Sequence, residues 1–349
     1  MTDPARPRIT VVTCLRDEGP FIVEWLAHLR ALGVDRVLAY SNDCRDWTAA
    51  LLDALSPAGV THVPQGDIRD TPGPAPQWRA LRAAWDHDAC AGADWLLHLD
   101  PDEWIALDGP GDLASLIAAA GEVDGIVMPW RLFGSSGRLT PGSGLTPERF
   151  RRAAPVGLAY PALASFVKTL FRRAGPFEGF GIHRPRQVGV PRLVDDTLAP
   201  LDEFAAAPSR ILLWRGGTAP AGRRVQLNHY SVRSIHEFLV KRGRGLPNHV
   251  GKAIDLTYWV ERNFNQHECD MIDPQLDAVR AECAALRARP GVSEAEAACR
   301  DAHRAALEAV LATEEGAVLC GRLALAGGSV APDARLGRAL VRLRQRASR

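Results

Sequence analysis

The chain has no closely spaced cysteine pair, no long apolar run and almost no net charge, and each absence narrows the possible functions. Its seven cysteines are scattered over 349 residues, without the spacing of a zinc site, which predicts free thiols in a reduced compartment. No stretch is long and uncharged enough to span a bilayer, and residues 1–8 lack the apolar centre of a signal peptide. We therefore expect a cytoplasmic protein.

The charges nearly cancel, because 42 Lys and Arg face 41 Asp and Glu, giving a formal net charge of +1. This balance gives no general electrostatic reason to expect nucleic acid as a partner. A basic tail at residues 335–349 is the exception. It offers either a peripheral contact with anionic lipid or an ordinary solvated helix. The sequence does not indicate an oligomeric state.

Two common nucleotide-binding motifs are also missing. No glycine-rich dinucleotide fingerprint follows the first apolar run, and the chain contains no P-loop. These absences disfavour a dehydrogenase or a kinase.

What is present is an alternation of strand and helix patterns. Apolar, β-rich runs at residues 9–14, 34–40, 59–63 and 94–99 alternate with helical spacing at residues 21–32, 47–55 and 77–90. Such alternation predicts an α/β fold with a mostly parallel sheet flanked by helices.

Further along the chain the pattern changes. A helix is expected after Asp112, a strand at residues 125–130, short strands at residues 166–171 and 211–214 within long loops, and a helix that starts at the capping box of Ser234 and Glu237. From residue 255 the chain reads as helical, without a strand signal. We expect an α/β domain over residues 1–250 and a helical C-terminal region over residues 251–349.

The segment from Asp94 to Glu103 is the most informative one, because an apolar strand ends there in two carboxylates. If the chain stays extended, Asp100 and Asp102 point to the same side and Pro101 points away. An oxygen-rich pair beyond the carboxyl end of a strand suits Mg²⁺ or Mn²⁺ holding a substrate phosphate. The alternative is a plain solvated turn. Asp17 and Asp43 follow the first two strands and should lie at the same edge.

The order of these motifs resembles the family 2-like glycosyltransferases, close to glycosyltransferase family 92. The matching residues are Val12 to Leu26, Tyr40 to Thr48, Leu99 to Glu103, Trp130 to Gly137, Val167 and Lys168, Gly181 to Pro185, Asn228 to Tyr230, Ser234, Glu237, Phe238, Lys241, Arg244 and Gly245. Arg233 stands where the family usually has a lysine. The resemblance covers roughly residues 9 to 250.

The resemblance implies a GT-A fold and transfer of a sugar, of hexosyltransferase type, from a nucleotide-diphosphate donor. Asp100 and Asp102 match the family's Asp-x-Asp metal motif, and Asp17 and Asp43 fall where such folds meet the nucleoside. The acceptor is expected to be a glycan or a lipid-linked saccharide, in the setting of bacterial surface polysaccharide synthesis. Mn²⁺ or Mg²⁺ is the expected cofactor.

Several other residues are candidates for the site. His229 is a possible further metal ligand, the alternative being a packed, hydrogen-bonded histidine. His183 is a candidate for contact with a phosphate or the acceptor, and Lys168, Lys241 and Arg244 for neutralising the diphosphate, although exposed cations are commonly just solvated.

An inverting enzyme also needs a base for the acceptor hydroxyl. Glu178 is the first candidate for this role and Glu103 the second. Two other functions stay open, namely a non-catalytic protein that binds nucleotide sugars and a nucleotidyltransferase that releases pyrophosphate.

Overall fold

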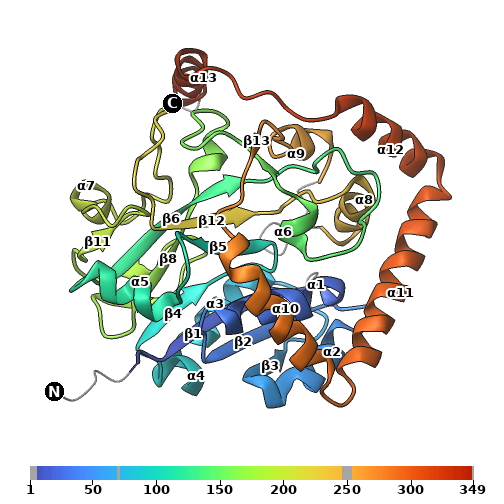
Figure 1. Cartoon of the computed structure of the whole chain (residues 1–349), viewed down its shortest axis with the longest axis horizontal. Coiled ribbons are helices and arrows are strands. Elements are labelled where there is room, and N and C mark those ends of the chain that lie inside the picture. Colours follow the sequence, from blue (N-terminus) through green and yellow to red (C-terminus); the bar gives the residue numbers. More distant parts are fainter. Residues whose placement is uncertain (1–5, 69–70, 246–253, 348–349) are drawn as a thin grey trace.

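A nine-stranded sheet forms the centre of the molecule (Figure 1). The structure is a computed structural model and describes residues 6–68, 71–245 and 254–347. The strand order is β3-β2-β1-β4-β8-β6-β12-β5, and β11 pairs with β6. The strands are β1 (Ile9–Leu15), β2 (Arg36–Ser41), β3 (Val60–Pro64), β4 (Trp95–His98), β5 (Glu103–Leu107), β6 (Gly125–Leu132), β8 (Val167–Arg172), β11 (Leu193–Val194) and β12 (Val225–His229).

Parallel pairs outnumber antiparallel ones in this sheet. Strands β1, β2, β3 and β4 run parallel to one another, and β6 is parallel to both β11 and β12. Strands β8 and β5 are antiparallel to theirs. The predicted mostly parallel sheet with flanking helices is therefore confirmed.

Helices cover both faces, and two small ribbons lie outside the sheet. The ribbons pair β9 (Phe177–Gly179) with β10 (Arg186–Gln187) and β7 (Arg152–Ala153) with β13 (His267–Glu268). The helices are α1 (Gly19–Ala31), α2 (Thr48–Leu55), η1 (Ser56–Ala58), α3 (Pro76–Asp86), α4 (Asp88–Ala91), α5 (Leu113–Ala120), α6 (Thr146–Arg149), η2 (Ala162–Ser165), α7 (Asp202–Ala205), α8 (Ile235–Arg244), α9 (Leu256–Val260), α10 (Asp273–Arg287), α11 (Val292–Leu311), α12 (Glu314–Ala326) and α13 (Ala334–Ala347). No helix among the described residues is both long and apolar enough to cross a bilayer.

The first strand shows why the sheet is buried on both sides. All seven residues of β1 are buried. Val11 and Leu15 belong to the core cluster that includes residues of α1 and α10, whereas Val12 and Cys14 belong to the cluster that includes residues of α3. An apolar run without polar alternation is what a strand covered on both faces requires.

One edge of the sheet collects the ends of strands that are far apart in sequence. Strands β1, β2, β4, β6 and β12 all end at this edge, and the antiparallel strands β8 and β5 begin there. The register places His229 opposite both Glu103 and Leu132, and Lys168 opposite Met128. In open α/β sheets ligands bind beyond the carboxyl ends of the strands.

Several predicted elements differ from the structure. Strands β5 and β12 were not expected. Strand β5 carries no alternation of polar and apolar residues, whereas Val225 to Asn228 in β12 do alternate and were overlooked. Residues 211–214 make only an isolated bridge from Leu212 to Phe166. The helix expected at residues 77–90 is divided at His87, whose backbone is extended and whose ring accepts a hydrogen bond from the N–H of Ala89.

The C-terminal region also differs in detail. It contains the short strand β13, although no strand was expected after residue 255. Helices α10 and α11 pack against α1 and α2 of the α/β part. The predicted domain boundary at residue 250 lies outside the described residues.

Candidate functional site

The two aspartates of the Asp-x-Asp segment lie in a tight turn that joins β4 to β5. The N–H of Glu103 donates to the carbonyl of Asp100 at 2.9 Å, which closes a four-residue turn with Pro101 in its second position. Proline at that position and aspartate at the first are typical of such turns. The predicted extended conformation is therefore wrong, because the chain must reverse here for β5 to pair with β12.

Asp100 is held by a buried lysine and a buried amide. One carboxylate oxygen accepts from Nζ of Lys168 at 2.9 Å, and the other accepts from Nε2 of Gln77 at 2.8 Å. Burial alone would raise the pKa of Asp100, but the ammonium of Lys168 and the ring of His98 together lower it below its ordinary value. Asp100 is therefore ionised at neutral pH.

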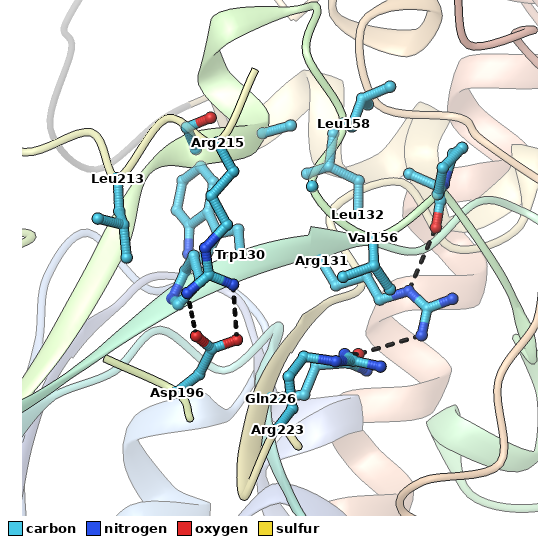
Figure 2. A pocket seen from close by; sticks show the side chains of 16 residues that line it. Trp130, Arg131, Leu132, Val156, Leu158, Asp196, Leu213, Arg215, Arg223 and Gln226 are labelled. Atoms are coloured by element: carbon cyan, nitrogen blue, oxygen red, sulfur yellow. Dashed lines mark hydrogen bonds and ion pairs between the residues drawn. The ribbon is translucent and has the colours of Figure 1, made fainter. Parts of the chain in front are cut away.

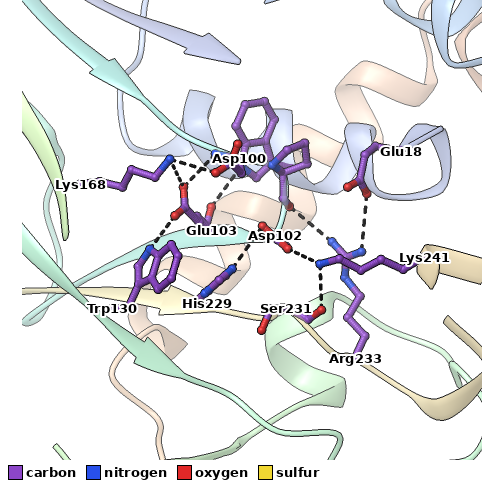
Figure 3. Close-up of polar contacts among 12 residues, drawn as sticks. Glu18, Asp100, Asp102, Glu103, Trp130, Lys168, His229, Ser231, Arg233 and Lys241 are labelled. Carbon is purple, nitrogen blue, oxygen red and sulfur yellow. Dashed lines mark hydrogen bonds and ion pairs between the residues drawn. The ribbon is translucent and has the colours of Figure 1, made fainter. Parts of the chain in front are cut away.

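Asp102 pairs with a different lysine, Lys241 (Figure 3). Its Oδ2 accepts from Nζ of Lys241 at 2.7 Å, and the same ammonium donates to the carbonyl of Ser231 at 2.8 Å. Its Oδ1 lies 3.6 Å from Nε2 of His229, which is too long for a hydrogen bond. Burial would raise the pKa of Asp102, but Lys241 and His229 hold it well below its ordinary value.

The side chain of Glu103 is completely buried and contacts Asp100, Lys168 and Trp130. Its carboxylate accepts from the N–H of Asp100 at 2.8 Å and from Nε1 of Trp130 at 2.6 Å, and it lies 3.2 Å from Nζ of Lys168. Burial raises its pKa to about 8, against the opposing effect of Lys168. This geometry makes Glu103 a positioning residue for Lys168 and Trp130. Its role as a catalytic base stays a prediction.

The raised pKa of Glu103 predicts a pH dependence of stability. The native state holds this proton more tightly than the unfolded chain does, so the contribution of Glu103 to stability is full below its ordinary pKa of 4.5. It is lost as the pH rises through about 8.

Thermal unfolding from pH 5 to pH 9 measures this effect. We expect the unfolding temperature of the wild type to fall, relative to that of Glu103→Gln, as the pH rises. The variant Glu122→Gln is the control, because its side chain is 94% exposed, and its difference from the wild type should stay flat. A wild-type curve parallel to that of Glu103→Gln would contradict the prediction.

Two arginines connect the end of the sheet to the loop after β1. Arg244, at the end of α8, forms an ion pair with Glu18, and its Nη1 donates to the carbonyl of Asp17 at 2.9 Å. The guanidinium of Arg233 lies 3.6 Å from the ring centre of Phe21, and its Nη1 lies 3.6 Å from Oε2 of Glu18. These contacts fix the position of α8 relative to the first loop, and with it that of Lys241.

The histidines of the site are neutral at neutral pH. Burial lowers the pKa of His98 to about 4 and that of His183 to about 3, and it lowers the pKa of His229. His183 lies with Nδ1 3.1 Å from the carbonyl of Val167, and the ring of His229 lies 4.1 Å from that of Trp130. A neutral imidazole keeps a lone pair that can accept a proton or a metal ion.

Backbone strain is concentrated at the same edge of the sheet. Among the described residues, Asp17, Asp43, Ser136 and Arg233 have positive φ angles although they are not glycine, and they follow β1, β2, β6 and β12 respectively. Such conformations are uncommon for L-residues and cluster at functional sites. Asp43 accepts a hydrogen bond from the side chain of Asn42 at 2.7 Å. The edge therefore has two independent marks of a site, buried charges and strained loops.

Three further side chains at this edge lie close enough together to bind one metal ion. Ligand atoms of Asp17, Cys44 and Asp46 lie within 4.8 Å of one another. Burial raises the pKa of the Cys44 thiol to about 12, so it is protonated and a poor ligand. We therefore do not assign a metal to these three residues.

The spacing of Asp102 and His229 would allow both side chains to bind one divalent cation. Two ligands that each lie about 2.1 Å from one Mg²⁺ are separated by at most about 4.2 Å. The 3.6 Å between Asp102 Oδ1 and His229 Nε2 falls within this limit. A neutral imidazole and an ionised carboxylate are suitable donors. Asp100 is not gathered with them, because both of its oxygens are engaged by Lys168 and Gln77.

The structure places Glu178 away from the buried charged residues around Asp100 and Asp102. It lies in β9, its side chain is 48% exposed, and it forms an ion pair with Arg186 at 2.7 Å. Among the described residues it has no contact with the two aspartates or their lysines. The β9–β10 ribbon, which the sequence pattern did not reveal, holds it there.

Sequence reasoning missed several residues of the network. His98, Gln77 and Glu18 were not candidates. His98 had a readable signal, because it is a polar residue two positions before Asp100 in an otherwise apolar strand. Gln77 and Glu18 had none, since their partners come from other elements.

A small cavity of about 30 Å³ is lined in part by Trp130 (Figure 2). Arg131, Arg215 and Gln226 are among the residues that line it, and Arg215 donates to Asp196 at 3.2 Å. The cavity has room for one or two water molecules and not for a nucleotide.

A much larger groove of about 1030 Å³ lies between α1, α10, α11 and the loop before α6. Phe21, Arg149, Arg287 and His303 are among its lining residues. The ring of Phe21 also contacts the guanidinium of Arg233, so the groove borders the charged residues of the site.

Comparison with known proteins does not establish a family. No protein-family model matches the chain, and no curated protein matches it. The similar solved structures include HddC from Yersinia pseudotuberculosis, which is 10% identical, with a TM-score of 0.31 over 53% of this chain and 88% of HddC.

Two other solved structures are comparably distant. Rv0371c from Mycobacterium tuberculosis H37Rv is 17% identical, with a TM-score of 0.22 over 36% of this chain and 67% of that protein. The apo form of the bifunctional glycosyltransferase WbbM is 11% identical, with a TM-score of 0.25 over 50% of this chain and 33% of WbbM. At these scores the similarities carry no functional argument.

Proposed function

We propose that this protein is a glycosyltransferase that uses a nucleotide-diphosphate sugar as donor. The observation that carries the proposal is the turn between β4 and β5. It presents two ionised aspartates, each beside its own lysine, at the sheet edge where α/β proteins bind ligands. The ordered motif resemblance in the sequence points to the same chemistry. The reaction would transfer a hexose with inversion to a saccharide or lipid-linked saccharide acceptor.

The chemistry asks for positive charge near the leaving diphosphate. When the bond between the sugar and the diphosphate breaks, the bonding electrons move onto the diphosphate oxygen and its negative charge grows. A positive group about 4 Å away contributes about 4 kcal/mol at an effective dielectric of 20. Lys168, Lys241 and Arg244 would supply positive charge near the diphosphate.

A divalent cation, Mn²⁺ or Mg²⁺, would be held by Asp102 and His229. When bound, it supplies charge neutralisation of the diphosphate. Asp100 would stay with Lys168 and keep that ammonium ionised, because the pKa of Lys168 is raised by Asp100 and Glu103 in spite of its burial.

The remaining candidates have supporting roles in the proposal. Asp17 and Asp43 would meet the nucleoside, since their strained loops end the first two strands. His183 would lie against a phosphate or the acceptor, and the groove beside Phe21 would receive the acceptor. Glu178 lies outside the residues that line this groove, so its role as the base stays a prediction from the sequence, which unchanged turnover in Glu178→Gln would refute.

The metal assignment predicts the behaviour of His229→Gln. We expect the variant to lose roughly 100-fold in Mn²⁺-dependent affinity for uridine or guanosine diphosphate, because outer-shell changes alone cost 10- to 100-fold. Calorimetric titration of each nucleoside diphosphate, with and without Mn²⁺, measures this. His267→Gln, on the exposed strand β13, is the control. Equal affinities for the wild type and His229→Gln would refute the assignment of His229.

Analysis of the products released from the donor separates the alternatives, because binding alone does not. A non-catalytic nucleotide-sugar-binding protein would bind the donor with the same metal dependence and release no product. A nucleotidyltransferase would release pyrophosphate instead of a nucleoside diphosphate. No observation in the site favours either over the transferase.

A further inference from the structure

Helix α13 has a charge pattern unlike that of the rest of the chain. It contains arginines and no acidic residue, although the chain as a whole is nearly neutral. The arginines are Arg335, Arg338, Arg342, Arg344 and Arg346. A helix with this composition needs a negatively charged partner or water on its polar side.

One face of α13 is attached to the body of the protein. Gly337 and Val341 are buried, and a Cβ atom at Gly337 would lie 2.7 Å from that of Ala159, so the backbones are in close contact. Nη1 of Arg338 donates to the carbonyl of Gly216 at 2.8 Å. Figure 1 shows the helix at the rim of the molecule. It is therefore a docked element with an outward face.

The outward face is apolar along its centre. Leu336 is 51% exposed and Leu343 is 65% exposed. They are seven residues apart, and Ala339 and Ala347 continue the same side of the helix at helical spacing. Exposing two large leucines on one helix side gives no stability to an isolated domain in water.

Arginines form a row beside this apolar stripe. Arg335, Arg342 and Arg346 are exposed and spaced seven and four residues apart. None of the three forms an ion pair with a described residue. An apolar stripe flanked by uncompensated positive charge is the pattern of a helix that lies in the interface of an anionic membrane.

We propose that α13 docks the protein on a bilayer that contains anionic phospholipid. Its leucines would enter the boundary between head groups and acyl chains, and its arginines would contact the phosphates. A second copy of the helix would bring like charges together, and a nucleic acid would leave the leucines in water. The proposal does not depend on the catalytic assignment.

Sedimentation of the full chain with lipid vesicles tests the proposal. Vesicles of phosphatidylglycerol and phosphatidylcholine are compared with vesicles of phosphatidylcholine alone. We expect binding only to the anionic vesicles, weakened by salt. The variant Arg342→Gln with Arg346→Gln should bind roughly 25-fold more weakly, since each arginine near such a surface contributes roughly fivefold.

Matched controls separate docking from net charge and from misfolding. Arg36→Gln with Arg82→Gln removes the same charge from β2 and α3 and should keep wild-type binding. Leu343→Glu should lose binding, whereas Val188→Glu, at a site 66% exposed, should keep it. Unfolding temperatures of all four variants confirm that they fold.

Three outcomes would overturn the proposal. The first is equal binding to both kinds of vesicle, and the second is an equal loss in the control variants. The third is a wild-type dimer in light scattering that Leu343→Glu converts to a monomer without any vesicle binding, which would make this face a contact between two copies of the chain.

Discussion

Replacing Asp102 by Asn will reduce donor turnover at least 1000-fold and lower the stability of the fold. The change removes the charge that faces Lys241 at 2.7 Å and that lies 3.6 Å from His229. Breaking a buried pair by removing one partner costs about 3–5 kcal/mol, because the remaining charge is left uncompensated. Turnover is lost because Lys241 and the proposed cation would both lose the carboxylate that binds them.

The measurement is the initial rate of donor consumption, together with urea unfolding at pH 7. Asp94→Asn is the control, because Asp94 lies in the same segment but its side chain is 48% exposed and pairs with Arg8. We expect the control to keep both turnover and stability. Turnover in Asp102→Asn equal to that of the control would mean that Asp102 has no part in catalysis.

Replacing Lys168 by Met will destabilise the protein by about 3–5 kcal/mol and remove activity. Lys168 is buried beside Asp100 and Glu103, so its loss leaves the ionised Asp100 without its cation. The ammonium of Lys168 also opposes the rise in the pKa of Glu103, so the pKa of Glu103 rises further in the variant. Its stability should therefore go on falling to a higher pH than that of the wild type.

A second substitution tests this reason directly. Glu103→Gln removes the titratable group whose pKa rises in Lys168→Met, so the double variant should recover the part of the stability that is lost at high pH. Coupling energies between residues in contact are about 0.5–3 kcal/mol. Urea unfolding of the wild type, both single variants and the double variant gives this coupling. Additive losses would show that Lys168 and Glu103 do not interact in the native state.

The first half of the fold was predictable because its signals are local. The alternation of strand and helix from β1 to β4 follows from hydrophobic spacing, and Asp112 and Ser234 cap the helices that they were expected to cap. Strand β5 was missed because its continuous apolar run removes the period of two by which a strand is recognised, whereas β12 is only five residues long and its alternation was overlooked.

The candidate site shows the same division. Lys168, Lys241, Arg244 and His229 could be proposed from motif order, and the structure brings them to one edge with the two aspartates. The conformation of the Asp-x-Asp turn could not be predicted, because it depends on where β5 pairs. The surroundings of Glu178 depend on a ribbon between two short segments, which leaves no pattern in the sequence.

The most direct test of the central claim is product analysis with nucleotide-diphosphate sugars. The purified full chain is incubated with a panel of such donors and Mn²⁺, and the products are separated by anion-exchange chromatography. The account predicts release of a nucleoside diphosphate from at least one donor, and none with Asp102→Asn. Release of pyrophosphate, or donor binding without any product across the panel and a mixed pool of saccharide acceptors, would contradict it.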